Sequence, residues 1–485
     1  MQTSLGIDIG GTGCKCVAFS EDGRQLALAY REYPLAPGTA DLSPDVMMDA
    51  VYEVISGCVG NLQDASTVRC ITVSSFGESF IAVGADGKPV LPQMPMYFAD
   101  TSNQDFVSLV EEFGRERMMR ICRVRPDAYY SLSKILFTRR HSPVPVSKYL
   151  FVASYVVFRL SGASVTDPSL ACRSLLYDVG NGCWARDILD AAGVRPDQLP
   201  DVVPTGSVAG QLLPDVAGRL RLPPDTKVLI GGLDQIVNAL GVGVRSPGDA
   251  VDVSGTVECI TPLFDGMPDN LRFYEDNYCC TPYLGKGFVT FAYNISAGSS
   301  VRWFRDAFGL GYADLNRLCP GEPTGLMVLP FLQGMGGTPE MDQAATGTVL
   351  GLNTATRLPD LYRALLEGIT FEMRYNLEKL SGHGIPVGRL LACGGGAKSD
   401  VWMQIKADIL GHDIVRVDTE EAGALGSAIL GFSALLAADP FALAQRFVRY
   451  GSVFTPDPER KLKYEKRYLT YKQLRTLCTG IRING

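Results

Sequence analysis

The residues best suited to chemistry near the start of the chain are an acidic residue, several glycines and a lysine. Asp8 ends an apolar run, Gly10, Gly11 and Gly13 follow it, and Lys15 leads into a second apolar run. Glycines let a backbone bend sharply and approach a ligand, and successive N–H groups of a turn can cradle a phosphate. A carboxylate at a strand end can hold Mg²⁺ and its waters, and a lysine can meet a phosphate as a point charge. The stretch predicts a phosphate-binding turn, although an ordinary glycine-rich hairpin fits it equally well.

A turn of the same kind recurs near the middle of the chain. Ser254, Gly255 and Thr256 separate two apolar runs and offer backbone donors and a hydroxyl with little side-chain bulk. Two such turns, one in each half of the chain, would form a clamp on the phosphates of a nucleotide. If the first turn were absent, an ordinary turn would explain the second one equally well.

A lone acidic residue, Asp234, follows Gly231 and Gly232 and lies between an apolar strand and an apolar helix. Phosphoryl transfer to a hydroxyl needs one base that accepts the hydroxyl proton, while the rest of catalysis is positioning and charge stabilisation. Asp234 suits that task, and capping of the helix is the simpler alternative.

Three further stretches could contact a ligand. Gly394, Gly395 and Gly396 lie between a strand and a helix that starts near Ser399, so a flat ring or a phosphate could rest against the backbone. Residues 74–79 and 96–100 combine carboxylates, hydroxyls and aromatic side chains, as a site for a polyhydroxylated ligand would. Taken separately, each of these is more often an ordinary loop.

These residues need elements to position them, and the sequence predicts two related α/β halves. The first 75 residues predict three antiparallel strands, a crossover helix over 44–60 and a parallel strand from 68 to 73. A strand over 227–230 follows a mostly helical region, and the strand–turn–strand pattern then recurs over 250–260. Helices are expected over 358–381, 399–411 and 422–437, a strand over 389–393, and a solvated amphipathic helix over 457–477. The repetition places a boundary near residue 245.

The composition of the chain disfavours several classes of partner and of catalytic site. The net charge is −7, which disfavours nucleic acid and anionic membranes as partners, and no apolar run reaches the about 18 residues that a membrane span needs. The 13 cysteines are scattered without a CxxC pair, and the first residues form a strand rather than a signal peptide, so a cytoplasmic protein with reduced thiols is expected. Only three histidines occur, which makes a zinc site or a Ser-His-Asp triad hard to build.

In this order, these stretches resemble the FGGY family of carbohydrate kinases, xylulokinase-like members above all, over nearly the whole chain. The most specific match is to the second signature of the family, Gly347 to Leu352 followed after seven residues by Asp360 to Glu367. Three more stretches resemble the first signature, the adenosine-contacting loop and the helix near that loop: Tyr129 to Phe137, with Phe137 where tryptophan is usual, Gly394 to Gln404, and Glu421 to Ala428.

The resemblance implies an α/β protein of the actin-like ATPase fold, with two ribonuclease-H-like domains around a central cleft. Residues 1–245 would be the N-terminal domain, which carries the sugar side, the first phosphate loop and the catalytic aspartate. Residues 246–485 would be the C-terminal domain, which carries the second phosphate loop and the adenosine loop.

The resemblance also implies roles for single residues. Asp234 would be the catalytic base, and Asp8 would work with Mg²⁺ through water. The sugar or polyol would contact Gly77, Glu78, Asp100, Asp234 and Gln235. ATP would contact Gly10, Gly11, Thr12, Gly13, Lys15, Ser254, Gly255, Thr256, Gly298, Gly395, Gly396, Ala397 and Asp400.

Departures from the family pattern cluster at the sugar side. The stretch Ser75 to Ser79 replaces Gly-Gln-Met-His-Gly, and Tyr97 to Asp100 replaces Trp-x-Asp without the arginine that usually follows. Ser154 replaces a common helical aspartate. The nucleotide residues are therefore well matched, whereas the identity of the sugar is open.

We expect an ATP- and Mg²⁺-dependent kinase that phosphorylates a hydroxyl of a small sugar or polyol, first of all a ketopentose such as xylulose. The alternatives within the family are glycerol, another polyol or a sugar acid. Asp234 would take the hydroxyl proton, and domain closure would exclude water and keep ATP hydrolysis slow without sugar. Two alternatives of another class are an actin- or chaperone-type ATPase and a sugar-responsive regulator, which would need an appended partner-binding or DNA-binding segment. A homodimer is the base-rate expectation.

Overall fold

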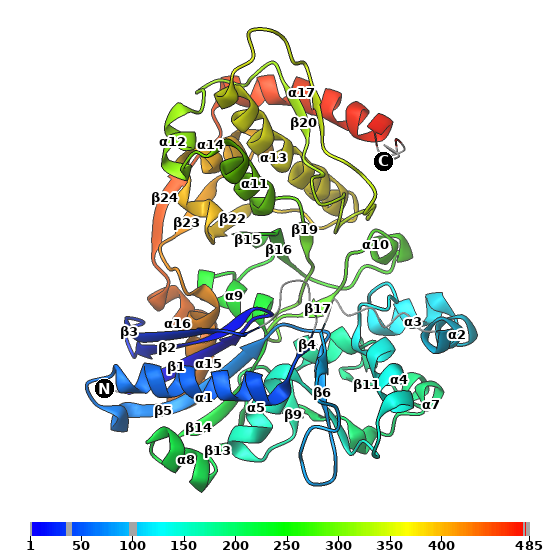
Figure 1. Ribbon diagram of the computed structural model, residues 1–485, viewed down its shortest axis with the longest axis vertical. Helices are drawn as coiled ribbons and strands as arrows, with labels where there is room; N and C mark the ends of the chain where they lie inside the picture. Colours follow the sequence, from blue (N-terminus) through cyan, green and yellow to red (C-terminus); the bar gives the residue numbers. More distant parts are fainter. Residues whose placement is uncertain (1, 35–40, 97–103, 479–480, 482–485) are drawn as a thin grey trace. The chain divides into compact units, whose positions relative to one another are not determined.

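The computed structural model describes residues 2–34, 41–96, 104–478 and 481, and the chain forms two compact units (Figure 1). The first unit consists of Met1–Gly243, Cys280–Phe288 and Glu421–Val448, and the second of Val244–Cys279, Val289–Glu420 and Arg449–Gly485. The units are thus interleaved along the sequence. The predicted boundary between the two domains, at 245/246, stays a prediction. A compact unit of the fold need not have the same limits as a domain of a protein family.

The first unit is built on a mixed six-stranded sheet in the order β13-β14-β5-β1-β2-β3. Its strands are β1 (Thr3–Ile9), β2 (Gly13–Ser20), β3 (Gln25–Glu32), β5 (Val68–Ser75), β13 (Val208–Gln211) and β14 (Lys227–Leu233). The antiparallel meander β1-β2-β3 continues through the parallel strands β5 and β14, and α1 (Pro44–Gly60) forms the crossover. The order of strands and crossover helix is the one that the sequence pattern predicts, and it is the ribonuclease-H-like arrangement that the family resemblance implies.

Helix α15 (Ala422–Leu436) packs closely against this sheet and against α9 (Asp234–Val242). A Cβ atom on Gly6 of β1 would lie 2.1 Å from the carbonyl oxygen of Ala424, and one on Gly426 would lie 1.8 Å from that of Val237. Such approaches need glycine, because any side chain would collide with backbone. The glycines therefore fix the start of α9, where Asp234 is found.

The second unit repeats the arrangement. Its strands are β15 (Asp249–Ser254), β16 (Glu258–Phe264), β19 (Ala292–Asn294), β22 (Arg389–Cys393), β23 (Ile414–Val417) and β24 (Tyr450–Phe454). β15 pairs antiparallel with β16 and parallel with β22, which pairs parallel with β23. Helices α13 (Leu358–Gly382) and α14 (Asp400–Leu410) pack against each other in this unit (Figure 1). The expected internal duplication is confirmed, since each unit sets an antiparallel hairpin beside parallel strands.

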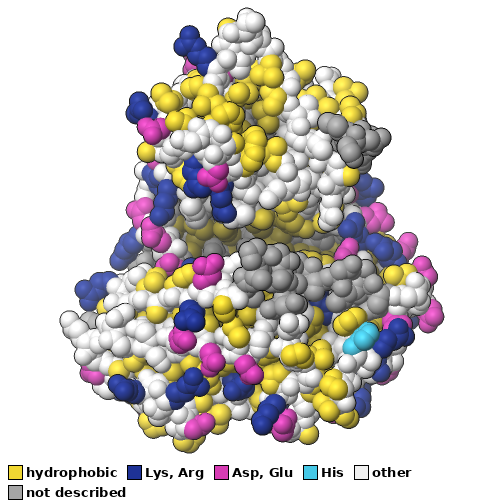
Figure 2. All heavy atoms as spheres, in the orientation of Figure 1, with side chains coloured by type: hydrophobic (Ala, Val, Ile, Leu, Met, Phe, Trp, Pro, Cys, Tyr) yellow, Lys and Arg dark blue, Asp and Glu magenta, His cyan; other side chains and the backbone are white. Residues whose placement is uncertain are grey.

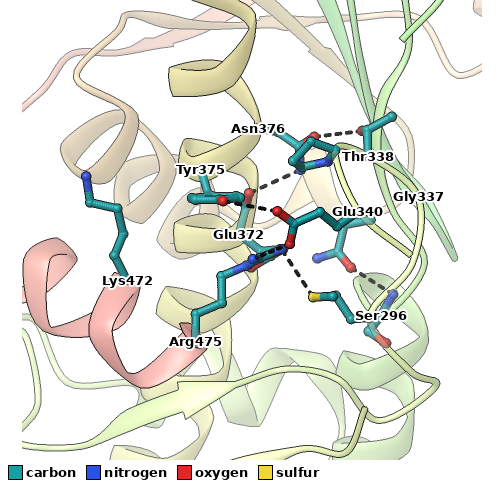
Figure 3. Close-up of polar contacts among 12 residues, drawn as sticks. Ser296, Gly337, Thr338, Glu340, Glu372, Tyr375, Asn376, Lys472 and Arg475 are labelled. Carbon is teal, nitrogen blue, oxygen red and sulfur yellow. Dashed lines mark hydrogen bonds and ion pairs between the residues drawn. The ribbon is translucent and has the colours of Figure 1, made fainter. Parts of the chain in front are cut away.

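The last helix, α17 (Pro458–Cys478), is not the solvated helix that its charged sequence predicts. Tyr464, Tyr471 and Arg475 are buried, and the Arg475 guanidinium donates to Glu372 of α13 at 3.0 Å and to Glu340 at 2.9 Å. Figure 3 shows Arg475 between these two carboxylates. The helix forms as predicted, but it is docked on α13 by a buried ionic and aromatic face.

The drawn face of the second unit carries hydrophobic side chains over α11 (Gly298–Phe308) and α12 (Tyr312–Leu318), where Trp303, Phe308 and Tyr312 are exposed (Figure 2). Elsewhere on the drawn faces of both units, positive and negative side chains are interspersed. No helix in the described part of the chain is long and apolar enough to cross a bilayer. All thirteen cysteines are free thiols.

Candidate active site

Asp234 is the first residue of α9 and follows directly after β14. The cap position of the helix is taken by Leu233, so Asp234 does not have the capping role that was the simpler interpretation. Its Oδ1 accepts a hydrogen bond from the N–H of Gln235 at 2.7 Å. The Oε1 of Gln235 is buried and has no hydrogen-bond partner among the described residues, which suits a side chain that awaits a polar ligand.

The surroundings of Asp234 favour its protonated form. Burial raises the pKa of Asp234 to about 8, the carboxylate of Asp8 adds to the rise, and the Gln235 N–H opposes it. Glu78 raises this pKa further, and Arg173 lowers it. The fold thus gathers two carboxylates and a guanidinium around Asp234, and a base with a pKa near the working pH is well matched to accept a proton from a hydroxyl.

Asp8 lies one residue before the end of β1, beside Ser74 of β5 and Lys15 of β2. Burial raises the pKa of Asp8, Lys15 lowers it and Glu421 raises it. A Cβ atom on Gly423, in the first turn of α15, would lie 3.4 Å from Oδ2 of Asp8. The carboxylate therefore faces the N-terminal turn of that helix.

The surroundings of Asp8 fit a Mg²⁺ ion held through water. Asp8 accepts no hydrogen bond from the residues that the structure describes, and these residues contain no cluster of three or more His, Cys, Asp or Glu side chains suited to a metal. Mg²⁺ binds proteins through one or two carboxylates and keeps several waters. The single, half-buried carboxylate of Asp8 is consistent with this mode of binding, whereas the described residues form no group of three or more His, Cys, Asp or Glu side chains that could surround a metal ion.

Lys15 already has a carboxylate partner. Its Nζ donates to Oε2 of Glu421 at 2.8 Å, and Glu421 occupies the cap position of α15. Burial lowers the pKa of Lys15, but the hydrogen bond to Glu421 and the negative charges of Glu421 and Asp8 together raise it above its usual value, so the ammonium stays charged. A phosphate at Lys15 would have to share the ammonium with this carboxylate.

The turn between β1 and β2 is tight. The N–H of Gly10 donates to the carbonyl of Gly13 at 2.9 Å, and the N–H of Tyr33 donates to that of Thr12 at 2.9 Å. A Cβ atom on Gly13 would lie 2.5 Å from the carbonyl oxygen of Arg31, so only glycine fits there. Thr12 is exposed and Gly11 partly exposed at the tip, where a ligand can reach their N–H groups.

On the sugar side, Glu78 is buried and held by an ion pair. It has the left-handed backbone conformation (φ 63°), and its Oε1 accepts a hydrogen bond from Nε of Arg173. The Arg173 guanidinium also lies 4.9 Å from the ring centroid of Tyr130. Burial lowers the pKa of nearby Lys134 to about 8, and Glu78 partly restores it. The predicted residue Asp100 lies outside the described residues.

In the second unit, three glycines converge on the backbone of the second turn. A Cβ atom on Gly298 would lie 2.1 Å from the carbonyl oxygen of Gly255, one on Gly394 2.9 Å from that of Ser254, and one on Gly396 2.8 Å from Cβ of Ser254. By contrast, no heavy atom lies within 4 Å of a Cβ position on Gly395. The glycine stretch therefore packs on the turn on one side and leaves open space at Gly395.

Helix α11 starts beside the same turn. The N–H of Ser299 donates to the carbonyl of Thr256 at 3.0 Å, and Nη2 of Arg302 donates to the Thr256 hydroxyl at 3.1 Å. The N–H groups of Ser299, Ser300 and Val301 in this first turn all donate to carbonyls, so an anion is favoured by the positive dipole end of the helix and by the Arg302 guanidinium. The arrangement can hold a phosphate near Thr256.

The remaining nucleotide-side predictions are Ala397, in the short 3-10 helix Gly396–Lys398, and Asp400, the first residue of α14. The carbonyl of Ala397 accepts a hydrogen bond from Arg416 at 3.3 Å, and the exposed carboxylate of Asp400 pairs with the same guanidinium at 2.7 Å. The predicted residues that the structure describes thus fall into two sets, one in each unit.

Sequence reasoning missed Arg173 and Arg302. Arg173 is the lone charged residue among the apolar positions 170–176, and its partner Glu78 lies 95 residues earlier. Arg302 lies four residues after Gly298, a spacing that places it one helical turn along from a predicted ligand residue. Only the second of these carried a local signal.

Comparison with known proteins gives the chain a clear set of relatives. Residues 3–241 match the model of the FGGY family of carbohydrate kinases, N-terminal domain, and residues 280–435 match that of its C-terminal domain. The chain is similar to the xylulose kinase of Bacillus subtilis (strain 168), with 27% identity over 98% of this chain and 97% of that protein. It is also similar to the gluconokinase of Bacillus licheniformis, with 27% identity over 95% and 93%. The crystal structure of gluconate kinase from Lactobacillus acidophilus has the same fold, with a TM-score of 0.89 and 22% identity over 99% and 98%.

Proposed function

The chain belongs to the FGGY family of carbohydrate kinases, and from that membership we propose that it transfers the γ-phosphoryl group of ATP to a hydroxyl of a ketopentose such as xylulose. It is a sugar kinase that uses ATP as phosphate donor. Relatives of equal identity bear the names xylulose kinase and gluconokinase, so their names support the class of reaction more strongly than the sugar.

One observation carries the proposal, namely the position of Asp234. This half-buried carboxylate has a raised pKa, starts a helix that it does not cap, and has Asp8 and Glu78 as charged neighbours. Ligand sensing alone needs no base in such surroundings, whereas phosphoryl transfer to a sugar hydroxyl or to water does, so Asp234 supports a phosphoryl-transfer enzyme and the family supports the sugar as acceptor.

In the proposed mechanism, the residues of the first unit bind and activate the acceptor. Asp234 accepts the proton of the attacking hydroxyl, while Gly77, Glu78, Asp100 and Gln235 hold the other hydroxyls. Mg²⁺, bound near Asp8 through water, would supply neutralisation of the charge on the β- and γ-phosphates. The turn of Gly10, Gly11, Thr12, Gly13 and Lys15 contacts the phosphates through N–H groups and the ammonium.

The residues of the second unit bind the nucleotide. Ser254, Gly255 and Thr256 and the start of α11 at Gly298 contact phosphate, and Arg302 adds a guanidinium next to Thr256. Gly395, Gly396, Ala397 and Asp400 border the adenosine. The open space at Gly395 supports this role, because a flat ring there would meet no side chain.

The charges on the sugar side favour a neutral acceptor over a sugar acid. Glu78 and Asp234 are both carboxylates, and Arg173 already donates to Glu78. A carboxylate accepts hydrogen bonds from hydroxyl groups but repels a second carboxylate. We therefore place ketopentoses first, glycerol and other polyols next, and sugar acids last.

The test is ADP release with Mg-ATP from a panel of D-xylulose, L-xylulose, D-ribulose, L-ribulose, glycerol, erythritol, L-fuculose and D-gluconate. One strong neutral responder supports the proposal. D-gluconate as the strongest responder contradicts the preference for a neutral acceptor. A flat panel with brisk ATP hydrolysis favours the ATPase alternative instead.

The thirteen free cysteines support a cytoplasmic location as part of the proposal.

A further inference from the structure

Lys406 carries its charge in the interior of the second unit. It lies on α14 and is fully buried, and its Nζ is 2.5 Å from Oδ2 of Asp252, 2.5 Å from Oγ of Ser254 and 2.7 Å from Oε1 of Glu258. Asp252 and Glu258 are fully buried as well. The contacts with Asp252 and Ser254 are hydrogen bonds, whereas the contact with Glu258 is an ion pair.

The three oxygens belong to the two strands that meet at the second phosphate turn. Ser254 and Glu258 are direct partners across β15 and β16, and the Gly255 N–H donates to the carbonyl of Val257 at 3.1 Å between them. Lys406 therefore ties together the residue before the turn and the residue after it.

The same lysine connects this turn to the Gly394–Gly396 stretch. Helix α14 starts just after that stretch, and Lys406 Nζ lies 5.1 Å from the ring centroid of Trp402. A Cβ atom on Gly396 would lie 2.8 Å from both Trp402 and Ser254. A continuous set of contacts thus joins the two nucleotide-side loops through one charged side chain.

The charge of this cluster depends on pH. Burial raises the pKa of Glu258 to about 7, Lys406 opposes the rise and Asp252 adds to it. Neither carboxylate oxygen of Glu258 accepts a hydrogen bond from the described residues, which disfavours the ionised form further. Cys393 of β22 keeps its proton, because burial raises the pKa of its thiol to about 12. The cluster therefore gains one negative charge when Glu258 ionises as pH rises.

Stability alone does not account for such a cluster. Apolar residues of similar volume often stabilise a protein as well as a buried ion pair does, or better. The cluster contacts both ends of the second phosphate turn, and this position indicates a role in holding the turn.

We infer that Lys406, Asp252 and Glu258 are positioning residues that hold the second phosphate turn in its binding shape, and that their net charge sets the affinity for the nucleotide. The inference rests on the proposed function, in which Gly255 and Thr256 contact ATP. The three residues act through the turn and not by contact with the nucleotide.

The first test is calorimetric titration with Mg-ADP between about pH 6 and about pH 8.5, for the wild type and for Glu258→Gln. The wild type is expected to lose affinity roughly 10-fold over this range, because a negative charge forms near the phosphates. Glu258→Gln keeps the shape without the charge, so its affinity stays constant. A wild-type affinity that does not change with pH, or an equal slope in the variant, overturns the inference.

The second test compares Lys406→Met with Asp408→Asn at one pH. Asp408 lies on the same helix, is buried and pairs with Arg460 at 2.6 Å outside the cluster. Both changes lower the unfolding temperature, but only Lys406→Met is expected to weaken Mg-ADP binding, by at least about 10-fold. Equal weakening in both variants overturns the inference. If Lys406→Met does not fold, the Glu258→Gln profile still decides. A wild type that binds no Mg-ADP contradicts the proposed function itself, and the inference falls with it.

Discussion

At the scale of single residues, Asp234 is the base of the proposed reaction. Asp234→Asn keeps the size of the side chain and removes the proton acceptor, so kcat is expected to fall about 10²–10⁴-fold while the KM for the sugar changes little. Steady-state kinetics of ADP release measures both constants. Asp276→Asn is the control, since Asp276 is a buried aspartate of the second unit that pairs with His383 and Arg272. Near-normal turnover in Asp234→Asn would remove the role that we give it.

The pH dependence of kcat tests the same residue in a second way. The base works only when it is ionised, and burial raises the pKa of Asp234 to about 8. The rate is therefore expected to climb as pH rises toward that value, with a midpoint at or below it because a cation near Asp8 would lower the pKa. The residual activity of Asp234→Asn should lack this ascending limb. The same limb in both proteins would assign it to another group.

The residues that the sequence predicts for catalysis can be recognised from the residues next to them in the chain. Asp8 and Asp234 each stand between an apolar strand and glycines or a helix, so local pattern is enough to select them. Arg173 and Lys406 gave no such signal. Their partners lie 95 and 154 residues away, and only the folded chain brings those charges into contact.

At the scale of elements, the Gly394–Gly396 stretch offers a test that separates binding from folding. Gly395 has a right-handed helical backbone conformation (φ −62°) and open space at its Cβ position, so Gly395→Ala should not change the unfolding temperature. A nucleotide that lies there would meet the new methyl group, and the affinity for Mg-ADP is expected to fall about 10-fold.

The control for Gly395→Ala is Gly382→Ala at the end of α13, where a Cβ atom also meets nothing. It should leave both the unfolding temperature and the affinity for Mg-ADP unchanged. If Gly395→Ala binds Mg-ADP as tightly as the wild type, the adenosine does not rest against this stretch.

Docking of α17 should contribute strongly to stability. Arg475→Met leaves Glu372 buried without its guanidinium, and breaking such a pair costs about 3–5 kcal/mol. Lys472→Met, on the same helix, removes only a partly exposed ion pair with Glu378, worth about 0–1 kcal/mol. Figure 3 shows that Lys472 lies apart from the Arg475 cluster. Urea unfolding measures both variants, and equal losses would contradict the structural account of this helix.

Local sequence pattern predicts well where the helices lie, but it predicts poorly which residues they pack against. The helix expected over 44–60 has those bounds, and the one expected over 358–381 ends one residue later. The helix expected over 457–477 exists, but its tyrosines are buried because Tyr471 and Tyr464 donate to Glu372 and Glu367 of α13, about 100 residues earlier. Sequence periodicity cannot reveal a partner at that distance.

At the scale of the whole molecule, the duplication could be predicted, because the strand–turn–strand pattern occurs twice. The composition of the compact units could not. Residues 421–448 lie far along the chain, yet α15 packs on β1 and β5 of the first unit. Gly426 lies inside a helix that the sequence predicts, but the sequence does not reveal that it is a point of close approach that this packing requires.

The central claim is that this protein phosphorylates a sugar rather than hydrolysing ATP. The most direct measurement is the rate of ADP release by one wild-type sample with Mg-ATP, before and after the best neutral sugar of the panel is added, with the product analysed by mass spectrometry. We predict that the sugar raises the rate by at least an order of magnitude and is recovered as its phosphate ester, because phosphoryl transfer requires a positioned acceptor hydroxyl. An equal rate without sugar, with inorganic phosphate as the product, would contradict the claim.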